Sequence, residues 1–113
     1  MHIGGIFGYT GVERFPEFYI RNCVNYGSIT VSGKAETVHI GGIVGSSFME
    51  YSDKTILTTI TNSMNFGTIS YDGTAMLNLY IGCIVGYNLL NDIDNCVNYG
   101  TITLNKKPEH IYI

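Results

Sequence analysis

A nine-residue motif, NCVNYGSIT at residues 22–30, determines the architecture because the chain contains it three times. It returns as NSMNFGTIS at residues 62–70 and as NCVNYGTIT at residues 95–103. The three starting points are 40 and then 33 residues apart. Self-similarity at such a period is typical of proteins in which one small structural unit stacks on the next.

A second motif alternates with the first and keeps the same order. It occurs as HIGGIVG at residues 39–45 and as YIGCIVG at residues 80–86; the chain also opens within it at residues 2–8 and ends within it at residues 110–113. We therefore predict one repeat domain over residues 1–113. Its predicted parts are a half repeat (1–19), two repeats (20–59 and 60–92) and a partial repeat (93–113).

Both predicted ends are uncapped. Stacked repeats normally carry polar caps, because an uncovered terminal unit exposes its core and a row of unpaired backbone groups. Two explanations fit this pattern. Either the chain is an excerpt of a longer repetitive protein whose neighbouring repeats cover the ends, or it is a subunit that associates head to tail with other copies and generates an open filament.

The two motifs together resemble the GLUG-type repeats of bacterial surface proteins and secreted peptidases. The resemblance covers nearly the whole chain, and this sequence departs from the pattern at Ser63, where the first motif has Cys, and at Cys83, where the second motif has Gly. The resemblance implies a spacer or display stalk of a large surface protein. It also implies an extracellular or cell-surface location.

The residues themselves indicate an all-β fold. After Gly27, Gly67 and Gly100, hydroxyl and apolar side chains alternate, a period of two that is typical of a half-buried strand. The preceding glycine suits a turn with positive φ. A strand before the first motif and another in the second motif make three short strands per repeat. We therefore predict a β-solenoid (parallel β-helix-like) of about three coils, with one repeat of 33–41 residues per coil.

In such a stack, equivalent residues lie about 4.8 Å apart along the axis. Apolar side chains would then form inward rows, and stacked amides would satisfy one another's hydrogen bonds at a corner. The predicted rows are two of asparagine (Asn22, Asn62, Asn95 and Asn25, Asn65, Asn98), one aromatic (Tyr26, Phe66, Tyr99) and one of isoleucine (Ile29, Ile69, Ile102).

Composition excludes several classes of function. The chain has 113 residues, of which only 13% are charged, and its net charge is −3. It has no basic stripe to neutralise phosphates, so we expect no nucleic-acid partner. Its apolar runs are far shorter than the roughly 20 residues that a transmembrane helix needs. No catalytic or cofactor-binding motif is present, and we expect no enzymatic activity.

Cysteine and histidine invite metal or disulfide chemistry, but their spacing argues against both. Cys23 and Cys96 would lie two coils apart, about 9.6 Å, which is beyond disulfide reach. We therefore expect the cysteines to be buried free thiols. His2, His39 and His110 share one position of the second motif, with Tyr80 completing the row, and no further ligand type recurs beside them. We therefore expect no metal site.

Ligand binding is the main alternative. The repeats differ most in length at residues 10–17 and 46–54, which we expect to protrude as loops from one edge. A glycan or protein ligand would bind there, and the candidate stacking side chains are Tyr9, Phe15, Phe18, Tyr19 and Tyr51. A weaker alternative is an ice-binding face formed by the rows of Ser and Thr that flank the isoleucine row.

The sequence leaves open which way one row of apolar side chains faces. Ile6, Ile43 and Ile84 have the opposite parity from the apolar residues around them, so either the adjacent glycines form a bend or an apolar stripe is exposed. The leading hypothesis is a non-enzymatic structural or display module that stacks end to end with neighbouring repeats or with other copies of the chain.

Overall fold

The computed structural model of the protein describes residues 1–12, 17–49, 57–89, 92–106 and 108–113. Every regular element in these ranges is a β-strand, which confirms the all-β prediction. The strands are β1 (His2–Gly4), β2 (Phe7–Val12), β3 (Glu17–Arg21), β4 (Val24–Asn25), β5 (Ile29–Val31), β6 (Lys34–Gly41), β7 (Val44–Met49), β8 (Leu57–Thr61), β9 (Met64–Asn65), β10 (Ile69–Tyr71), β11 (Thr74–Gly82), β12 (Val85–Asn88), β13 (Asp92–Asp94), β14 (Val97–Asn98), β15 (Ile102–Leu104) and β16 (His110–Tyr112).

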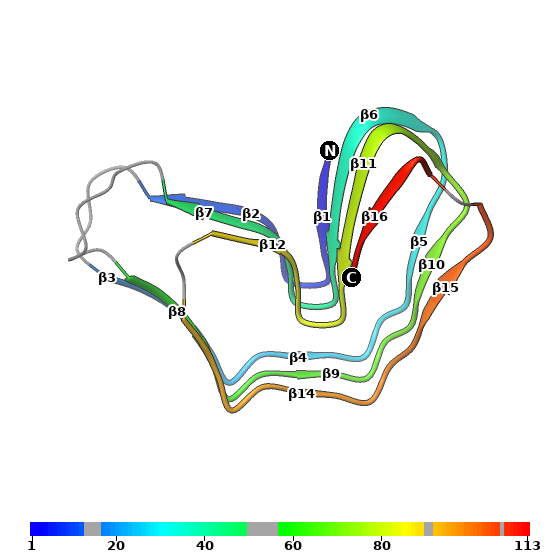
Figure 1. The fold of residues 1–113 in the computed structure, drawn as a ribbon. Coiled ribbons are helices and arrows are strands. Elements are labelled where there is room, and N and C mark those ends of the chain that lie inside the picture. Colours follow the sequence, from blue (N-terminus) through cyan, green and yellow to red (C-terminus); the bar gives the residue numbers. More distant parts are fainter. Residues whose placement is uncertain (13–16, 50–56, 90–91, 107) are drawn as a thin grey trace.

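Strands from successive repeats pair in parallel. One sheet has the order β1-β6-β11-β16, and four three-stranded sheets have the orders β2-β7-β12, β3-β8-β13, β4-β9-β14 and β5-β10-β15. Figure 1 shows these strands following the same path one over another. Ile69 pairs with Ile29 on one side and with Ile102 on the other, so each motif lies in register with its own copies. The prediction of parallel sheets is confirmed.

The prediction of three strands per repeat is wrong. Along the described chain, the stretch from β3 to β7 contains five strands, and the stretch from β8 to β12 repeats them. The chain has more strands than predicted because it turns a corner at additional points. Asn22 and Asn62 adopt left-handed φ values of 57° and 50° and separate the strand before the first motif from the strand within it.

The prediction that Gly27, Gly67 and Gly100 supply positive φ is also wrong. Among the described residues, left-handed φ values occur at Asn22, Asn62, Asn95 and Gly33. Glycine is needed at residue 67 for a different reason, because an added Cβ would clash with the carbonyl oxygen of Gly27 in the preceding repeat. Gly100 meets the carbonyl of Gly67 in the same way. Close stacking therefore explains these glycines.

The second motif forms a bend between two hydrophobic clusters. β6 and β11 turn inward, reverse at the glycines and continue outward as β7 and β12 (Figure 1). Ile40 belongs to a cluster with Val31, Leu79 and other side chains of β5, β6, β10 and β11. Ile43 belongs to a second cluster with Ile20 and Ile60. The glycine bend therefore resolves the parity of Ile43, which is fully buried.

Part of the expected loop region is strand. β2 extends to Val12 and β7 to Met49, and the two strands pair along this extension. The Thr10 hydroxyl donates a buried hydrogen bond of 2.9 Å to the Ser47 hydroxyl, so this part of the edge is ordered by pairing. The remaining positions of the expected loops, residues 13–16 and 50–54, lie outside the described residues.

The molecule measures 39 × 27 × 16 Å along its principal axes. Within the described ranges no helix has the length and apolarity that crossing a bilayer requires.

Candidate functional site

One of the two predicted asparagine rows is a continuous chain of side-chain hydrogen bonds. The Asn25 amide Nδ2 donates to Asn65 Oδ1 at 2.8 Å, and Asn65 Nδ2 donates to Asn98 Oδ1 at 2.8 Å. Each amide also donates to the carbonyl oxygen of the glycine two residues later in its own repeat, for example Gly67 at 2.9 Å. Asn25 and Asn65 are buried, so this row satisfies polar groups inside the molecule.

The asparagine row lies directly against the glycine bends of the second motif. A Cβ added at Gly5 would lie 2.6 Å from Asn25 Cγ, and one added at Gly42 would lie 2.5 Å from Asn65 Cγ. The first and second motifs therefore pack against each other, the asparagine of the first against the glycine bend of the second. Sequence analysis missed this contact, although the strict alternation of the two motifs was a signal that they belong together.

The other asparagine row has a backbone role. Asn22, Asn62 and Asn95 have exposed side chains and left-handed φ values. Asparagine tolerates this region because its short polar side chain can bond locally. The Asn22 and Asn62 N–H groups donate to the carbonyl oxygens of Thr61 and Asp94 in the next repeat, each at 3.2 Å. This row therefore marks a corner between strands.

The aromatic row is a parallel ring stack on the surface. The centroids of Tyr26 and Phe66 are 5.1 Å apart, those of Phe66 and Tyr99 are 4.9 Å apart, and both pairs are within 9° of parallel. Tyr26 and Tyr99, the two ends of the stack, are more exposed than the central ring. Each end therefore keeps one ring face without a neighbour from this row.

The isoleucine row lies inside the molecule, and its burial depends on position in the stack. Ile69, with a neighbour on each side, is 1% exposed, whereas Ile29 and Ile102 are half-buried. In the second cluster the C-terminal side behaves in the same way, since Ile60 is fully buried and its partner Ile93 is 43% exposed, but Ile20 on the N-terminal side is 2% exposed. Loss of burial at the end of an apolar column is therefore clearest on the C-terminal face, at Ile93, Ile102 and Leu104.

The cysteines are free and half-buried, rather than fully buried as expected. Ser63 occupies the position between Cys23 and Cys96. Its side chain is completely buried, and its hydroxyl donates to the Thr61 carbonyl at 3.0 Å and accepts from the Cys23 N–H at 3.3 Å. In the central repeat a hydroxyl therefore replaces the thiol, and this hydroxyl both donates and accepts a hydrogen bond.

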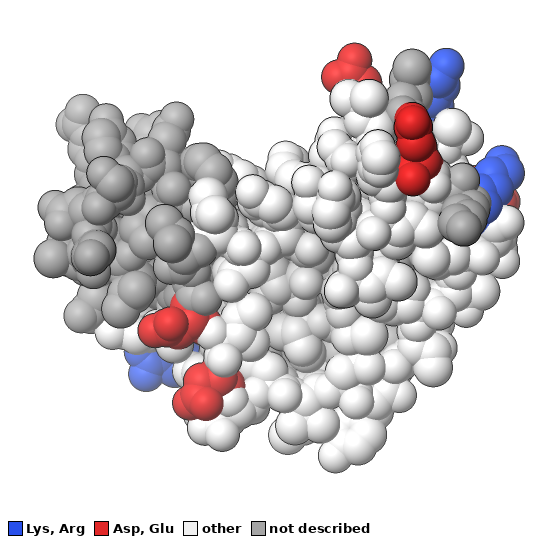
Figure 2. All heavy atoms as spheres, in the orientation of Figure 1, with Lys and Arg blue, Asp and Glu red and all other residues white. Residues whose placement is uncertain are grey.

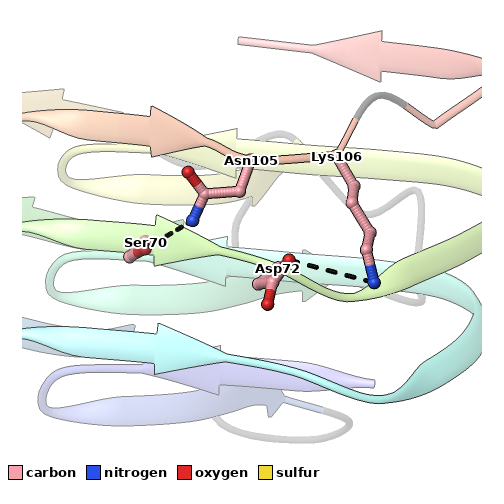
Figure 3. Close-up of polar contacts among 4 residues, drawn as sticks. All are labelled: Ser70, Asp72, Asn105 and Lys106. Atoms are coloured by element: carbon pink, nitrogen blue, oxygen red, sulfur yellow. Dashed lines mark hydrogen bonds and ion pairs between the residues drawn. The ribbon is translucent and has the colours of Figure 1, made fainter.

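The hydroxyl rows lie on the outer surface. The Thr68 hydroxyl donates to the Ser28 hydroxyl at 3.0 Å, and Ser70 pairs in register with Thr30 and Thr103. Beyond the end of β15, Asn105 and Lys106 reach back to Ser70 and Asp72 of the preceding repeat, at 3.5 and 3.9 Å (Figure 3). The Lys106–Asp72 ion pair is more than half exposed, so its contribution to stability is about 1 kcal/mol or less.

A groove of about 390 Å³ lies between the inward-running strands β1, β6 and β11 and the outward-running strands β2, β7 and β12. Its walls are aromatic and imidazole rings with three neutral polar side chains, Thr37, Ser46 and Asn78. The rings belong to His2, Tyr9, His39, Tyr80 and Tyr87. Figure 2 shows a notch in the upper side of the molecule, and the described residues at its floor are not Lys, Arg, Asp or Glu.

The structure corrects the predicted histidine row. His39 pairs with His2 and with Tyr80, but Tyr80 pairs with Tyr112, whereas His110 pairs with Asn78. The last copy of the motif therefore lies two residues away from the alignment expected from its histidine. Buried Leu79 of β11 pairs with half-buried Ile111 of β16, and this apolar pair fits the observed register, which an exposed residue such as His110 does not specify.

His2 and His39 share a hydrogen bond in the groove, with their Nδ1 atoms 3.0 Å apart. The pKa of His39 is lowered from 6.5 to about 4, first because burial disfavours the imidazolium and then because of the charges of His2 and the N-terminal ammonium. Burial and the same ammonium lower the pKa of His2. Both imidazoles are therefore neutral near pH 7, and the described lining residues include no Lys, Arg, Asp or Glu side chain.

Of the five predicted ligand aromatics, the structure describes the side chains of Tyr9 and Tyr19, which lie on different sheets. Tyr9 lines the groove and contacts the His2 ring at 5.1 Å between centroids. Tyr19 lies on β3, where the Arg21 guanidinium is 4.4 Å from its ring centroid. Phe18 is a residue of β3, and Phe15 and Tyr51 lie outside the described residues. No group of three or more His, Cys, Asp or Glu side chains suited to a metal ion occurs within the described ranges.

Comparisons with protein-family models, with curated proteins and with solved structures gave no match.

Proposed function

We propose that the chain is a β-solenoid segment of about three coils that acts as a non-enzymatic structural or display module. In this proposal each coil stacks on the next, and the ends of the segment stack on further coils. The observation that carries the proposal is the hydrogen-bonded row Asn25–Asn65–Asn98, because a row of this kind can continue through any number of coils.

The row has a direction that favours head-to-tail stacking. Every amide donates toward the C-terminal side and accepts from the N-terminal side. At one end Asn98 keeps an Nδ2 hydrogen facing a further coil, and at the other end Asn25 Oδ1 keeps acceptor capacity. A donor end meets an acceptor end when two copies stack head to tail, which gives a heterologous contact that propagates.

Apolar burial supports the same arrangement. Ile93, Ile102 and Leu104 end their columns on the C-terminal face, and Ile3, Ile6 and Phe7 do so on the N-terminal face. A further coil would bury these side chains as Ile60 and Ile69 are buried in the middle of the molecule. Each square ångström of apolar surface removed from water contributes about 25 cal/mol, so such faces favour association.

The partner in this proposal is either the neighbouring repeat of a longer chain or a second copy of this one. The resemblance to GLUG-type repeats supports a role as a spacer or display element outside the cell or at its surface. Low charge and mutually satisfied polar rows suit a stacking scaffold.

A second candidate function, a ligand-binding adhesin module, is favoured by the groove. Sequence analysis assigned ligand binding to the variable loops, but the groove lies between the strands that precede and follow the glycine bend. The rings, hydroxyls and amide among its described lining residues fit a neutral saccharide, which presents both apolar ring faces and hydroxyl groups. Tyr9, which is 53% exposed, is the most accessible of the three phenol rings in the lining, since Tyr80 and Tyr87 are half-buried.

End-to-end stacking is tested with the Asn98→Asp variant. The carboxylate still accepts the hydrogen bond from Asn65 Nδ2, but it has no donor for the next coil and adds a negative charge at the junction. We expect the wild type to form species that grow with concentration in sedimentation velocity, and we expect Asn98→Asp to stay small. Glu36→Gln changes an exposed charge on β6, between β1 and β11, and should assemble as the wild type does.

A wild-type chain that remains monomeric at all concentrations, with the same sedimentation coefficient as Asn98→Asp, would contradict association between copies. Electron micrographs of the same samples distinguish rods, which the proposal predicts, from irregular aggregates, which count against ordered stacking.

A further inference from the structure

The sheet of β4, β9 and β14 carries an apolar surface on one outer side of the molecule (Figure 1). The residues before and after its buried asparagines, Asn25 and Asn65, are exposed, and the equivalent residues around Asn98 are exposed as well. They form an aliphatic column and an aromatic column, which together we call the lateral face. Its six side chains are Val24, Met64, Val97, Tyr26, Phe66 and Tyr99.

The exposure of the lateral face is a property of the side of the stack. Met64 and Phe66 belong to the central repeat and have an equivalent residue on each side, yet each is 39% exposed. By contrast, Ile60 and Ile69 of the same repeat are buried in the two apolar clusters. Contiguous exposed apolar side chains on a soluble protein mark a contact surface.

The composition of the lateral face is that of the core of a protein interface. Such cores are enriched in Tyr, Phe and Met, depleted in charged residues and surrounded by a polar rim. No residue of the segments 22–28, 62–68 and 95–101 is charged. Two exposed polar rows border the lateral face, one of asparagine and one of hydroxyl side chains: Asn22, Asn62, Asn95 and Ser28, Thr68, Thr101. The partner is therefore expected to be uncharged where it touches this face.

We propose that the lateral face binds the lateral face of a second copy of this chain. The spacing of the face argues for this partner. Its rings follow one another at 5.1 and 4.9 Å, so a partner that matches every ring must repeat at the same interval. A second copy, aligned parallel to the first, has this interval.

The shape of the face argues for the same partner. One column consists of rings and the other of smaller aliphatic side chains. A twofold rotation about the stack axis therefore sets the aromatic column of each copy against the aliphatic column of the other, which is a self-complementary contact. Paired sheets with stacked side chains interdigitate in this manner in dry sheet-to-sheet interfaces.

The size of the face predicts a weak, reversible dimer. Three coils expose a few hundred square ångströms of apolar surface, whereas a standard interface buries about 800 Å² per partner. The contact runs along the stack, so its area grows with the number of coils, and chains that are joined end to end would bind side by side more tightly. This inference goes beyond the proposed end-to-end stacking and uses a different surface.

The variants for the test separate the two contacts. Asn98→Asp, which is expected to block end-to-end stacking, provides the background. Met64→Lys adds an ammonium group at the centre of the lateral face, where its long aliphatic stem can remain on the sheet. Leu77→Lys is the matched control, because Leu77 is 52% exposed and lies on β11, outside the lateral face. Circular dichroism with thermal unfolding verifies that every variant is folded.

Sedimentation velocity up to millimolar concentration measures the association. We expect Asn98→Asp to form a monomer–dimer equilibrium. Adding Met64→Lys should raise the dissociation constant at least tenfold, whereas adding Leu77→Lys should leave it within about threefold. In a mixture of isotope-labelled and unlabelled Asn98→Asp chains, isotope-filtered NMR should show contacts between the Met64 methyl group of one copy and the Phe66 ring of the other.

The possible results separate the two proposals. If Asn98→Asp stays monomeric while the wild type forms large species, or if Met64→Lys leaves the dimer unchanged, the lateral contact is overturned and end-to-end stacking stands. A wild type that stops at a dimer sensitive to Met64→Lys would support the lateral contact and overturn end-to-end stacking. An absence of association in every protein would overturn both.

Discussion

Gly67 lies so close to the Gly27 carbonyl oxygen of the preceding repeat that no side chain fits between them. A Cβ added at Gly27 would not clash, because its nearest neighbour would be Asn25 Oδ1 at 3.5 Å. These two glycines occupy the same motif position and differ only in having a repeat beneath them. The pair therefore separates the requirement of stacking from any requirement of the local turn.

Gly67→Ala is expected to lower the free energy of unfolding by about 3 kcal/mol or more, since its Cβ overlaps backbone that strand pairing holds in place. Gly27→Ala is expected to change it by less than about 1 kcal/mol, because the added methyl group has ordinary contact distances. Urea unfolding followed by circular dichroism measures both. Equal destabilisation by the two variants would mean that the turn, and not close stacking, requires glycine.

The buried amide row predicts a large effect from a nearly isosteric change. In Asn65→Asp the donor to Asn98 Oδ1 and to the Gly67 carbonyl is lost, and a carboxylate faces both oxygens. We expect a loss of about 3 kcal/mol or more of unfolding free energy at pH 7, because a buried charge without a partner is costly.

The matched control is Asn98→Asp, at the exposed end of the same row. This variant also loses the bond to the Gly100 carbonyl, but its carboxylate reaches solvent and still accepts from Asn65 Nδ2, so we expect a loss of only about 1 kcal/mol. Similar unfolding free energies for Asn65→Asp and Asn98→Asp would show that the central amide is not held as the account requires.

The histidine pair predicts a pH dependence. His39 has a pKa of about 4 in the folded protein and 6.5 as an isolated side chain, so the unfolded state binds the proton more tightly. Its contribution to stability is therefore complete above pH 6.5 and is lost as the pH falls toward 4. The slope from this one group is at most about 1.4 kcal/mol per pH unit.

Urea unfolding at intervals between pH 4 and pH 7.5 measures this slope. His39→Gln removes the titrating ring, and we expect its stability to change less over the same range than that of the wild type. A wild-type protein whose stability is the same at pH 4.5 and pH 7 would contradict the lowered pKa.

The groove predicts binding of neutral saccharides. We expect a neutral oligosaccharide to shift the amide resonances of Tyr9, Ser46 and Tyr87 in NMR titrations, and Tyr9→Ala to weaken the affinity at least fivefold. Tyr26→Ala removes an equally large exposed ring outside the groove and should leave the affinity unchanged. Resonance shifts confined to β4, β9 and β14, or equal weakening by both variants, would exclude the groove as the site.

The parallel pairing of equivalent residues was predictable because two different motifs recur in the same order, and stacked repeats place identical residues over one another. The number of strands was not, because a corner such as Asn22 depends on a left-handed backbone conformation that asparagine permits without requiring. The contact between Asn65 and Gly42 could not be predicted either, because the two segments lie close together only as a result of the inward bend.

The surface positions were the least predictable part of the candidate site. Tyr9 was among the predicted ligand aromatics, but its partners in the groove were not identified, because they lie on strands that approach only after the chain reverses at the glycines. Aligning the last motif by His110 gave the wrong register, since solvent-facing residues contribute little to register.

The central claim, that successive repeats lie directly over one another, is tested most directly by NMR scalar couplings across backbone hydrogen bonds. The Ile29 N–H donates to the Thr68 carbonyl and the Ile69 N–H to the Thr101 carbonyl, each at 2.8 Å. The account predicts a coupling between Ile29 nitrogen and Thr68 carbonyl carbon, and a second between Ile69 nitrogen and Thr101 carbonyl carbon. Couplings from these amides to carbonyls of other segments would contradict it.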